Sequence, residues 1–157
     1  MKKIKVWDLL IFVVTAELGG AVSSVLSGGG FAEYYGSLIK PPLSPPGWVF
    51  PVVWAVLYAL MGISAYLIYD SGSPDKQQAL TVYGVQLIAN MLWTPVFFGI
   101  RSFVGAAIVV CVMLVLVARM IAVFYKTDKR AAYLNIPYLA WTLFAAYLTF
   151  GTLLLNK

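Results

Sequence analysis

The sequence predicts an all-α integral membrane protein, a bundle of five transmembrane helices. Of its 157 residues, 62% are hydrophobic and only 11% are charged, and the mean hydropathy is +0.88. A soluble domain carries about 25% charged residues, because water must wet its surface. The apolar residues also come in runs of the length that crosses a bilayer, about 20 residues. Composition and run length therefore both indicate a chain that lies within a membrane.

Five apolar windows have the length of a membrane-spanning helix: residues 6–26, 48–69, 79–98, 103–124 and 133–154. The breaks between them are rich in Gly, Pro, Ser and charged residues, which end helices. The weakest break is 99–102, where we expect a tight turn because 79–124 is too long for one span. The long connection at 27–47 is predicted to be a proline-rich loop. We expect a single transmembrane domain over residues 1–157.

The first window also resembles a secretory signal peptide, because Lys2, Lys3 and Lys5 precede an apolar run. Two observations favour a retained helix instead. Asp8 and Glu17 interrupt the apolar run, and no small-residue cleavage site follows it.

The basic residues predict both the partner and the orientation. The net charge is +5, but the basic residues form no basic face and the chain has no nucleic-acid-binding motif. Anionic lipid headgroups are therefore the expected partner. The amino-terminal side of the bundle carries Lys2, Lys3, Lys5, Lys76, Lys126, Lys129 and Arg130, and the opposite side carries Lys40, Arg101 and Lys157. The positive-inside rule then predicts a multi-pass protein of the cell membrane, with the amino terminus in the cytoplasm and the 27–47 loop outside.

The chain contains no histidine, which excludes Ser-His-Asp and Cys-His catalysis, HExxH zinc sites and the commonest haem ligand. Cys111 is the single cysteine, so an intrachain disulfide is excluded and a resident metal is not expected. We therefore assign no catalytic residue, no metal and no required cofactor. Any chemistry must use aromatic rings, amides, a few carboxylates or the ligand itself.

Three polar side chains are predicted to lie at membrane depth. A carboxylate there costs about 2.5–3.5 kcal/mol on insertion scales, so Glu17 should face the interior of the bundle. Gln86 and Asn90 are four residues apart and share one helix face. Two interpretations stay open for all three residues. They line a ligand cavity, or they bond to neighbouring helices, with Glu17 then in its protonated form.

Small residues recur in the first window at four-residue spacing, at Ala16, Gly20 and Ser24. Such a stripe lets two membrane helices approach closely. The sequence does not distinguish a partner helix within the bundle from one in another subunit.

The chain is rich in aromatic residues, with five Trp and ten Tyr. Trp7 and Trp48 lie at span ends, where interfacial belts explain them. Trp54, Trp93 and Trp141 lie deeper, where each indole N–H is expected to find an acceptor. Their flat faces suit a planar apolar ligand, and ordinary packing is the alternative.

The end of the 27–47 loop carries four prolines in the six residues 41–46, which favours extended backbone and excludes helix. With Tyr34 and Tyr35, this segment is predicted to cover the outer mouth of the bundle as a lid. The alternative is a passive linker.

Three ordered blocks resemble a known family. They are KP at 40–41 with PPGWVFPVVWAVLY at 45–58, QLIAN at 86–90 with WTPVFFGIR at 93–101, and PYLAW at 137–141 followed by FA at 144–145. Together they resemble the TspO/MBR family, which includes tryptophan-rich sensory proteins, translocator proteins and peripheral-type benzodiazepine receptors.

This resemblance implies a five-helix bundle, commonly a homodimer, with a ligand pocket under the first loop. The family's ligands include porphyrins such as protoporphyrin IX, cholesterol in animal members, and synthetic drugs. Tetrapyrrole transport or sensing is the implied function. By motif match, the implied ligand-binding residues are Tyr34, Pro45, Trp54, Asn90, Trp93, Trp141 and Ala145.

At two positions the sequence departs from the family pattern, and each departure argues against one activity of the family. The loop tryptophan that pairs with the fifth-helix tryptophan in light-dependent porphyrin degradation is replaced by Leu43, so this activity is not expected. The L/V-x₁₋₅-Y-x₁₋₅-K/R pattern fails because no basic residue follows Tyr147 before Lys157, so sterol binding is not supported. The leading hypothesis is a porphyrin-binding membrane protein for transport or sensing. The alternatives are a porphyrin-degrading enzyme and a regulatory membrane partner with a vestigial pocket.

Overall fold

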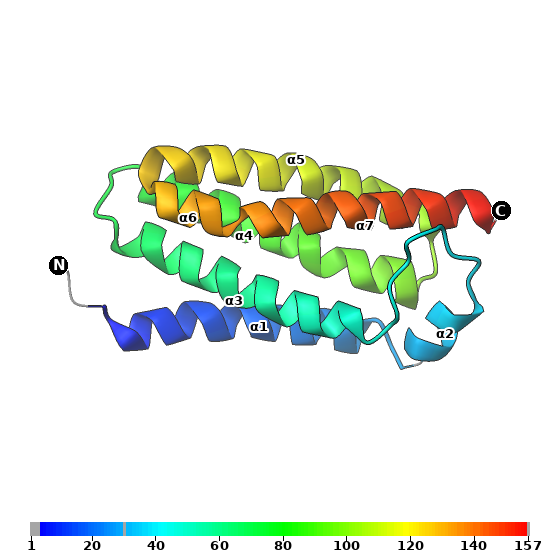
Figure 1. Ribbon diagram of the computed structural model, residues 1–157. Coiled ribbons are helices and arrows are strands. Elements are labelled where there is room, and N and C mark those ends of the chain that lie inside the picture. Colours follow the sequence, from blue (N-terminus) through cyan, green and yellow to red (C-terminus); the bar gives the residue numbers. More distant parts are fainter. Residues whose placement is uncertain (1–3, 30, 157) are drawn as a thin grey trace.

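The computed structural model describes residues 4–29 and 31–156, which fold into a long bundle of helices (Figure 1). The membrane-crossing segments are α1 (Val6–Leu26), α3 (Val49–Asp70), α4 (Lys76–Thr94) continued by the π-helix η1 (Pro95–Gly99), α5 (Phe103–Thr127), and α6 (Lys129–Leu134) continued by α7 (Ile136–Leu155). Each of the five is long and apolar enough to cross a bilayer. The predicted fold class, an all-α membrane bundle of five spans, is confirmed.

The fifth predicted span, 133–154, begins earlier than the sequence suggested. The Asp128 side chain accepts a hydrogen bond from the Arg130 backbone N–H at 2.8 Å and so starts a helix at Lys129. The Arg130 guanidinium also bonds the Asp128 carboxylate at 2.8 Å, which lowers the pKa of Asp128 below its ordinary value. Asn135 then separates α6 from α7.

The 27–47 connection is not loop throughout. A short helix, α2 (Phe31–Ser37), forms in its first half, which the sequence analysis did not predict. It lies at one end of the bundle, where its Phe31 contacts Phe98 of η1 (Figure 1). The proline segment after it contains no helix, as expected.

The predicted tight turn between the third and fourth spans is confirmed. The α4 helix widens at Pro95 into η1, and the Ile100 N–H bonds the Pro95 carbonyl at 2.8 Å. Arg101 then adopts a positive φ of 58°, and the Ser102 hydroxyl accepts from the Gly105 N–H to start α5. Three residues, 100–102, are thus enough to reverse the chain.

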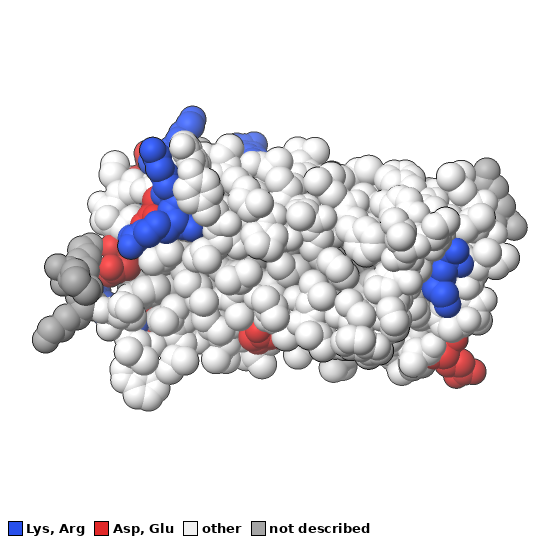
Figure 2. All heavy atoms as spheres, viewed as in Figure 1, with Lys and Arg blue, Asp and Glu red and all other residues white. Residues whose placement is uncertain are grey.

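Charged side chains gather at the two ends of the bundle, and the face seen in Figure 2 is almost uncharged between them. At the end where α1 begins, Lys5 Nζ lies 3.9 Å from Asp70 Oδ1. Lys2, Lys3 and Lys157, which the orientation prediction also uses, lie outside the described residues. The distribution is that of a molecule whose middle lies in hydrocarbon.

The α1 helix lies at the edge of the bundle and packs chiefly on α3 (Figure 1). Glycines permit this contact. A Cβ on Gly62 would lie 2.5 Å from Val13 Cα, and one on Gly20 would overlap the Tyr58 ring. The Ser23 hydroxyl donates to the Met91 carbonyl of α4 at 2.7 Å. The small-residue stripe of α1 therefore meets α3 at Gly20, and the adjacent Ser23 meets α4, all within the same chain.

We predict that Gly62→Ala destabilises the bundle, because the new methyl group meets backbone atoms of α1 that have no room to shift. Overpacking of this kind costs about 1–3 kcal/mol. The expected result is a Tm several degrees below that of the wild type, measured by thermal unfolding in detergent. Gly84→Ala is the control, because no atom lies within 4 Å of its Cβ position and alanine favours helix. Equal Tm values for the two variants would show that the α1–α3 contact is not close.

Candidate ligand cavity under the lid

A cavity of about 1100 Å³ lies between α1, α3, the α4–η1 segment and the lid, which we define as residues 31–47. This is at or above the upper end of ordinary ligand pockets, which run to about 1,000 Å³. The described residues that line it are Glu17, Gly20, Ala21, Ser24, Phe31, Ala32, Tyr35, Gly36, Lys40, Ser44, Pro45, Pro46, Gly47, Trp48, Phe50, Pro51, Trp54, Ala55, Tyr58, Trp93, Thr94 and Phe98.

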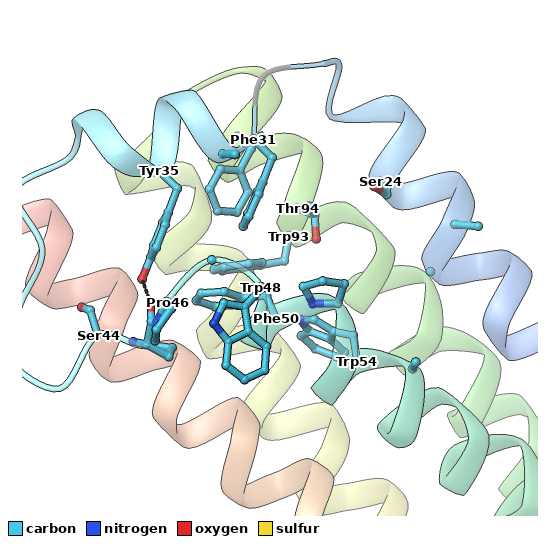
Figure 3. Close-up of a pocket in the computed structure, with 18 of the residues that line it drawn as sticks. Ser24, Phe31, Tyr35, Ser44, Pro46, Trp48, Phe50, Trp54, Trp93 and Thr94 are labelled. Carbon is cyan, nitrogen blue, oxygen red and sulfur yellow. Dashed lines mark hydrogen bonds between the residues drawn. The ribbon is translucent and has the colours of Figure 1, made fainter.

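Aromatic rings form most of the inner wall (Figure 3). On α3, Trp54 stacks on Tyr58 with ring centroids 5.5 Å apart. On the α4–η1 side, Trp93 meets Phe98 edge to face at 6.0 Å. Phe31 of the lid contacts Phe98 at 4.6 Å. Because each ring is held by another ring, the wall offers flat apolar surfaces in fixed positions.

The lid has its own internal structure. Phe31 and Tyr35 stack with an angle of 3° between their planes, and the Tyr35 hydroxyl donates to the Pro45 carbonyl at 2.7 Å. Burial raises the pKa of the Tyr35 hydroxyl above its ordinary value, which keeps the group a hydrogen-bond donor. Lys40 donates to the Tyr35 carbonyl at 3.0 Å and lies 4.8 Å above the Tyr35 ring. These contacts join α2 to the proline segment.

The carboxyl end of α7 anchors the lid to the bundle. The Asn156 side chain accepts from the Ile39 N–H at 3.0 Å and donates to the Ile39 carbonyl at 2.8 Å. Tyr147 donates to the Pro42 carbonyl at 2.7 Å. Pro41 packs so closely on Gly151 that a Cβ there would lie 2.6 Å from the proline ring. The lid is thus attached to a helix that does not itself line the cavity.

Beneath the cavity, four polar side chains of α3, α4 and α7 form a buried hydrogen-bond network. Tyr58 donates to the Asn90 carbonyl oxygen at 2.5 Å, and the Asn90 amide donates to the Tyr138 hydroxyl at 3.0 Å. Tyr138 in turn donates to the Gln86 carbonyl oxygen at 2.9 Å. The Gln86 amide faces the Met61 sulfur at 3.7 Å. Gln86 and Tyr138 are fully buried and Asn90 is 2% exposed.

The structure places four of the nine predicted site residues on the cavity wall: Glu17, Pro45, Trp54 and Trp93. The other five, Tyr34, Gln86, Asn90, Trp141 and Ala145, are not among the lining residues. Their contact with a ligand stays a prediction. Two interpretations were open for the polar residues at membrane depth. Gln86 and Asn90 follow the second, because they bond to neighbouring helices, and Glu17 follows the first, because it faces the cavity.

Of these five, Trp141 lies behind the cavity wall and Tyr34 belongs to the lid itself. Trp141 packs edge to face on the cavity residue Phe50, with centroids 5.9 Å apart. Tyr34 lies on α2 with the Arg101 guanidinium 4.5 Å from its ring centroid. Burial raises the pKa of Tyr34, and the Arg101 charge acts in the opposite direction.

The expectation that each deep indole finds an acceptor is wrong, because within residues 4–29 and 31–156 no hydrogen bond is formed by the indole of Trp54, Trp93 or Trp141. The Nε1 atoms of Trp93 and Trp141 are buried and have no acceptor in the described part of the chain. Both indoles pack against aromatic rings, which accept N–H groups only weakly. Each therefore leaves an unpaired donor beside the cavity.

Sequence reasoning missed several lining residues, most clearly Trp48. It was assigned to an interfacial belt, yet it lines the cavity while 69% exposed. A usable signal was present. Pro51, Trp54, Ala55 and Tyr58 stand at i, i+3, i+4 and i+7 and so define one face of α3, and all four line the cavity.

The structure is thus a multi-pass membrane bundle with an aromatic cavity under an anchored lid. Among the described residues, no three His, Cys, Asp or Glu side chains are placed to hold a metal ion.

The chain belongs to the TspO/MBR family, whose model matches residues 11–155. It is 43% identical to a tryptophan-rich sensory protein of Cereibacter sphaeroides over 79% of this chain and 77% of that protein. It is 32% identical to protein CrtK of Rhodobacter capsulatus, over 93% and 91% of the two chains. It is 38% identical to a translocator protein of Sus scrofa, over 88% and 84%.

We predict that Asn156→Ala loosens the lid, because it removes both hydrogen bonds to Ile39. At about 0.5–1 kcal/mol for each bond, the open population of the lid should rise roughly five- to thirtyfold. Hydrogen exchange of a peptide spanning 31–47, followed by mass spectrometry, measures this change. Thr127→Ala is the control, since it removes only a bond within its own helix at the other end of the bundle. Unchanged exchange in Asn156→Ala would show that the lid is held by other contacts.

We predict that Tyr138→Phe destabilises the protein by about 1–3 kcal/mol, because the Asn90 amide and the Gln86 carbonyl oxygen lose their common partner while buried. The matched control is Tyr133→Phe, since the Tyr133 side chain is 59% exposed. Thermal unfolding in detergent should give a lower Tm for Tyr138→Phe alone. Equal Tm values would indicate that the network does not stabilise the bundle.

Proposed function

We propose that this protein binds tetrapyrroles such as protoporphyrin IX in the cavity under the lid, and acts in their transport or sensing. The observation that carries the proposal is the cavity itself, with about 1100 Å³ of space walled by fixed aromatic rings. A planar macrocycle buries a large apolar area between such surfaces. Membership of the TspO/MBR family supports the same ligand class.

The cavity also offers a group for the acidic side chains of a porphyrin. Lys40 lines the cavity at the lid. Its ammonium group has three donors, of which one goes to the Tyr35 carbonyl. The remaining donors are suited to a carboxylate, and a charge-assisted bond of this kind is about twice as strong as a neutral one. A porphyrin would therefore enter with its propionates toward the lid.

We further propose a homodimer in the cell membrane, with the amino terminus in the cytoplasm and the lid outside. The charge distribution supports the orientation. Among the described residues, Lys5, Lys76, Lys126, Lys129 and Arg130 stand at or near the helix ends opposite the lid, and Lys40 and Arg101 contact Tyr35 and Tyr34 of the lid. The family resemblance supports the dimer.

The position of Leu43 favours binding over light-dependent degradation. This residue stands where the degrading relatives are expected to carry a lid tryptophan. Its side chain is 83% exposed, and it is not among the cavity-lining residues. The lid thus contributes no indole at this position to react with a bound porphyrin.

We predict that Ala55→Trp weakens protoporphyrin IX binding at least about tenfold, because the new indole occupies space that the ligand needs. The matched control is Val56→Trp, since the adjacent Val56 is 56% exposed and does not line the cavity. The change in the Soret band on titration measures binding. Empty detergent micelles give the background.

Saturable binding by the wild type and by Val56→Trp, with loss in Ala55→Trp, is the expected result. Partitioning by the wild type that matches empty micelles would reject porphyrin binding and favour a regulatory protein with a vestigial pocket.

A further inference from the structure

Glu17 lies near the middle of α1 and faces the cavity, where it is half-buried. It is eleven residues from Val6 and nine from Leu26, the ends of the helix. At about 1.5 Å per residue, the carboxylate is about 14–16 Å from either end of the span. It therefore sits at the depth where water screens a charge least.

No group of the described chain neutralises this carboxylate. Within residues 4–29 and 31–156, no hydrogen bond or ion pair reaches Glu17. The nearby Tyr58 hydroxyl already donates to Asn90. Lys40, the one basic residue on the described cavity wall, is bonded to the lid at the Tyr35 carbonyl. Lys5, which directly precedes α1, pairs with Asp70 at the end of the bundle opposite the lid.

Aromatic faces surround the same space. Glu17 and Gly20 are three residues apart and lie on one face of α1, and Gly20 is in contact with the Tyr58 ring. Tyr58 is in turn stacked on Trp54 at 5.5 Å. Trp93 and Trp48 line the cavity as well. Trp is the ring that attracts cations most strongly, and Tyr follows.

We propose that the cavity also binds planar aromatic cations, with Glu17 as their counter-ion and the Trp54–Tyr58 stack as a cation–π surface. An uncompensated carboxylate at this depth is costly, and a bound cation offsets that cost directly. The flat rings bury the apolar part of the same ligand. This ligand class is separate from the porphyrins, whose acidic groups match Lys40 rather than Glu17.

The test uses two ligands of the same shape that differ only in charge: N-methylacridinium, a permanent cation, and 9-methylanthracene, its uncharged isostere. The full-length protein is placed in nanodiscs of neutral phosphatidylcholine, so that the membrane surface does not attract the cation. Ligand fluorescence on titration reports binding, and empty nanodiscs give the background. The variants are Glu17→Gln and, as the control, Glu33→Gln, an exposed lid residue that does not line the cavity.

We expect the wild type and Glu33→Gln to bind N-methylacridinium saturably and with equal affinity. Glu17→Gln should bind it about tenfold or more weakly, as for other desolvated charge pairs, and should bind 9-methylanthracene as the wild type does. The proposal is overturned if Glu17→Gln loses affinity for both ligands equally, or if its affinity for the cation is unchanged. If Glu17→Gln does not fold, the wild type decides alone, and a cation that binds no better than its isostere after background correction overturns the proposal.

A protoporphyrin IX titration of the same nanodiscs separates this inference from the proposed function. Saturable porphyrin binding without saturable cation binding rejects the cation proposal and leaves the porphyrin proposal standing. The reverse result rejects porphyrin binding and supports a cavity for aromatic cations.

Discussion

The hydrogen bond from Tyr58 to Asn90 is the interaction on which the cavity most depends. The Tyr58 ring is part of the cavity wall, and its hydroxyl belongs to the network that joins α3 to α4 and α7. In hydrocarbon, a polar group that leaves this network finds no water to replace its partner. The ring is therefore held in place, and with it the stacked Trp54 and the contact with Gly20 of α1.

The lid depends on a different physical condition, because it lies outside the spans and is open to competition from water. Its prolines reduce the freedom of the backbone before any contact is made. The Tyr35 and Asn156 hydrogen bonds then need to order only a short segment. These hydrogen bonds hold the lid over the cavity.

The sequence predicted the spans well and the site only in part. A membrane-spanning helix is defined by the length of its apolar run, so the five helices could be predicted from hydropathy. The chain reversal at 99–102 could be predicted because 79–124 is too long for a single span. Helix α2 was missed because its seven residues have too short a pattern to identify. Gln86 and Asn90 were placed on a shared face correctly, but a sequence does not show whether that face meets a cavity or Tyr138. The unpaired indoles of Trp93 and Trp141 depend on ring packing that no local pattern encodes.

The two charged side chains on the cavity wall make its two ends electrostatically different. Lys40 lies at the lid, and Glu17 lies at mid-bilayer depth on α1. Under the proposed function, an acid-bearing ligand is attracted to Lys40 and repelled by Glu17, so that its carboxylates stay at the lid and only its apolar ring enters the bundle. A cation has the opposite preference and is drawn to the inner end. Because the walls between are aromatic, they suit either proposed ring system, and under the two proposals these two side chains decide which part of a ligand enters first.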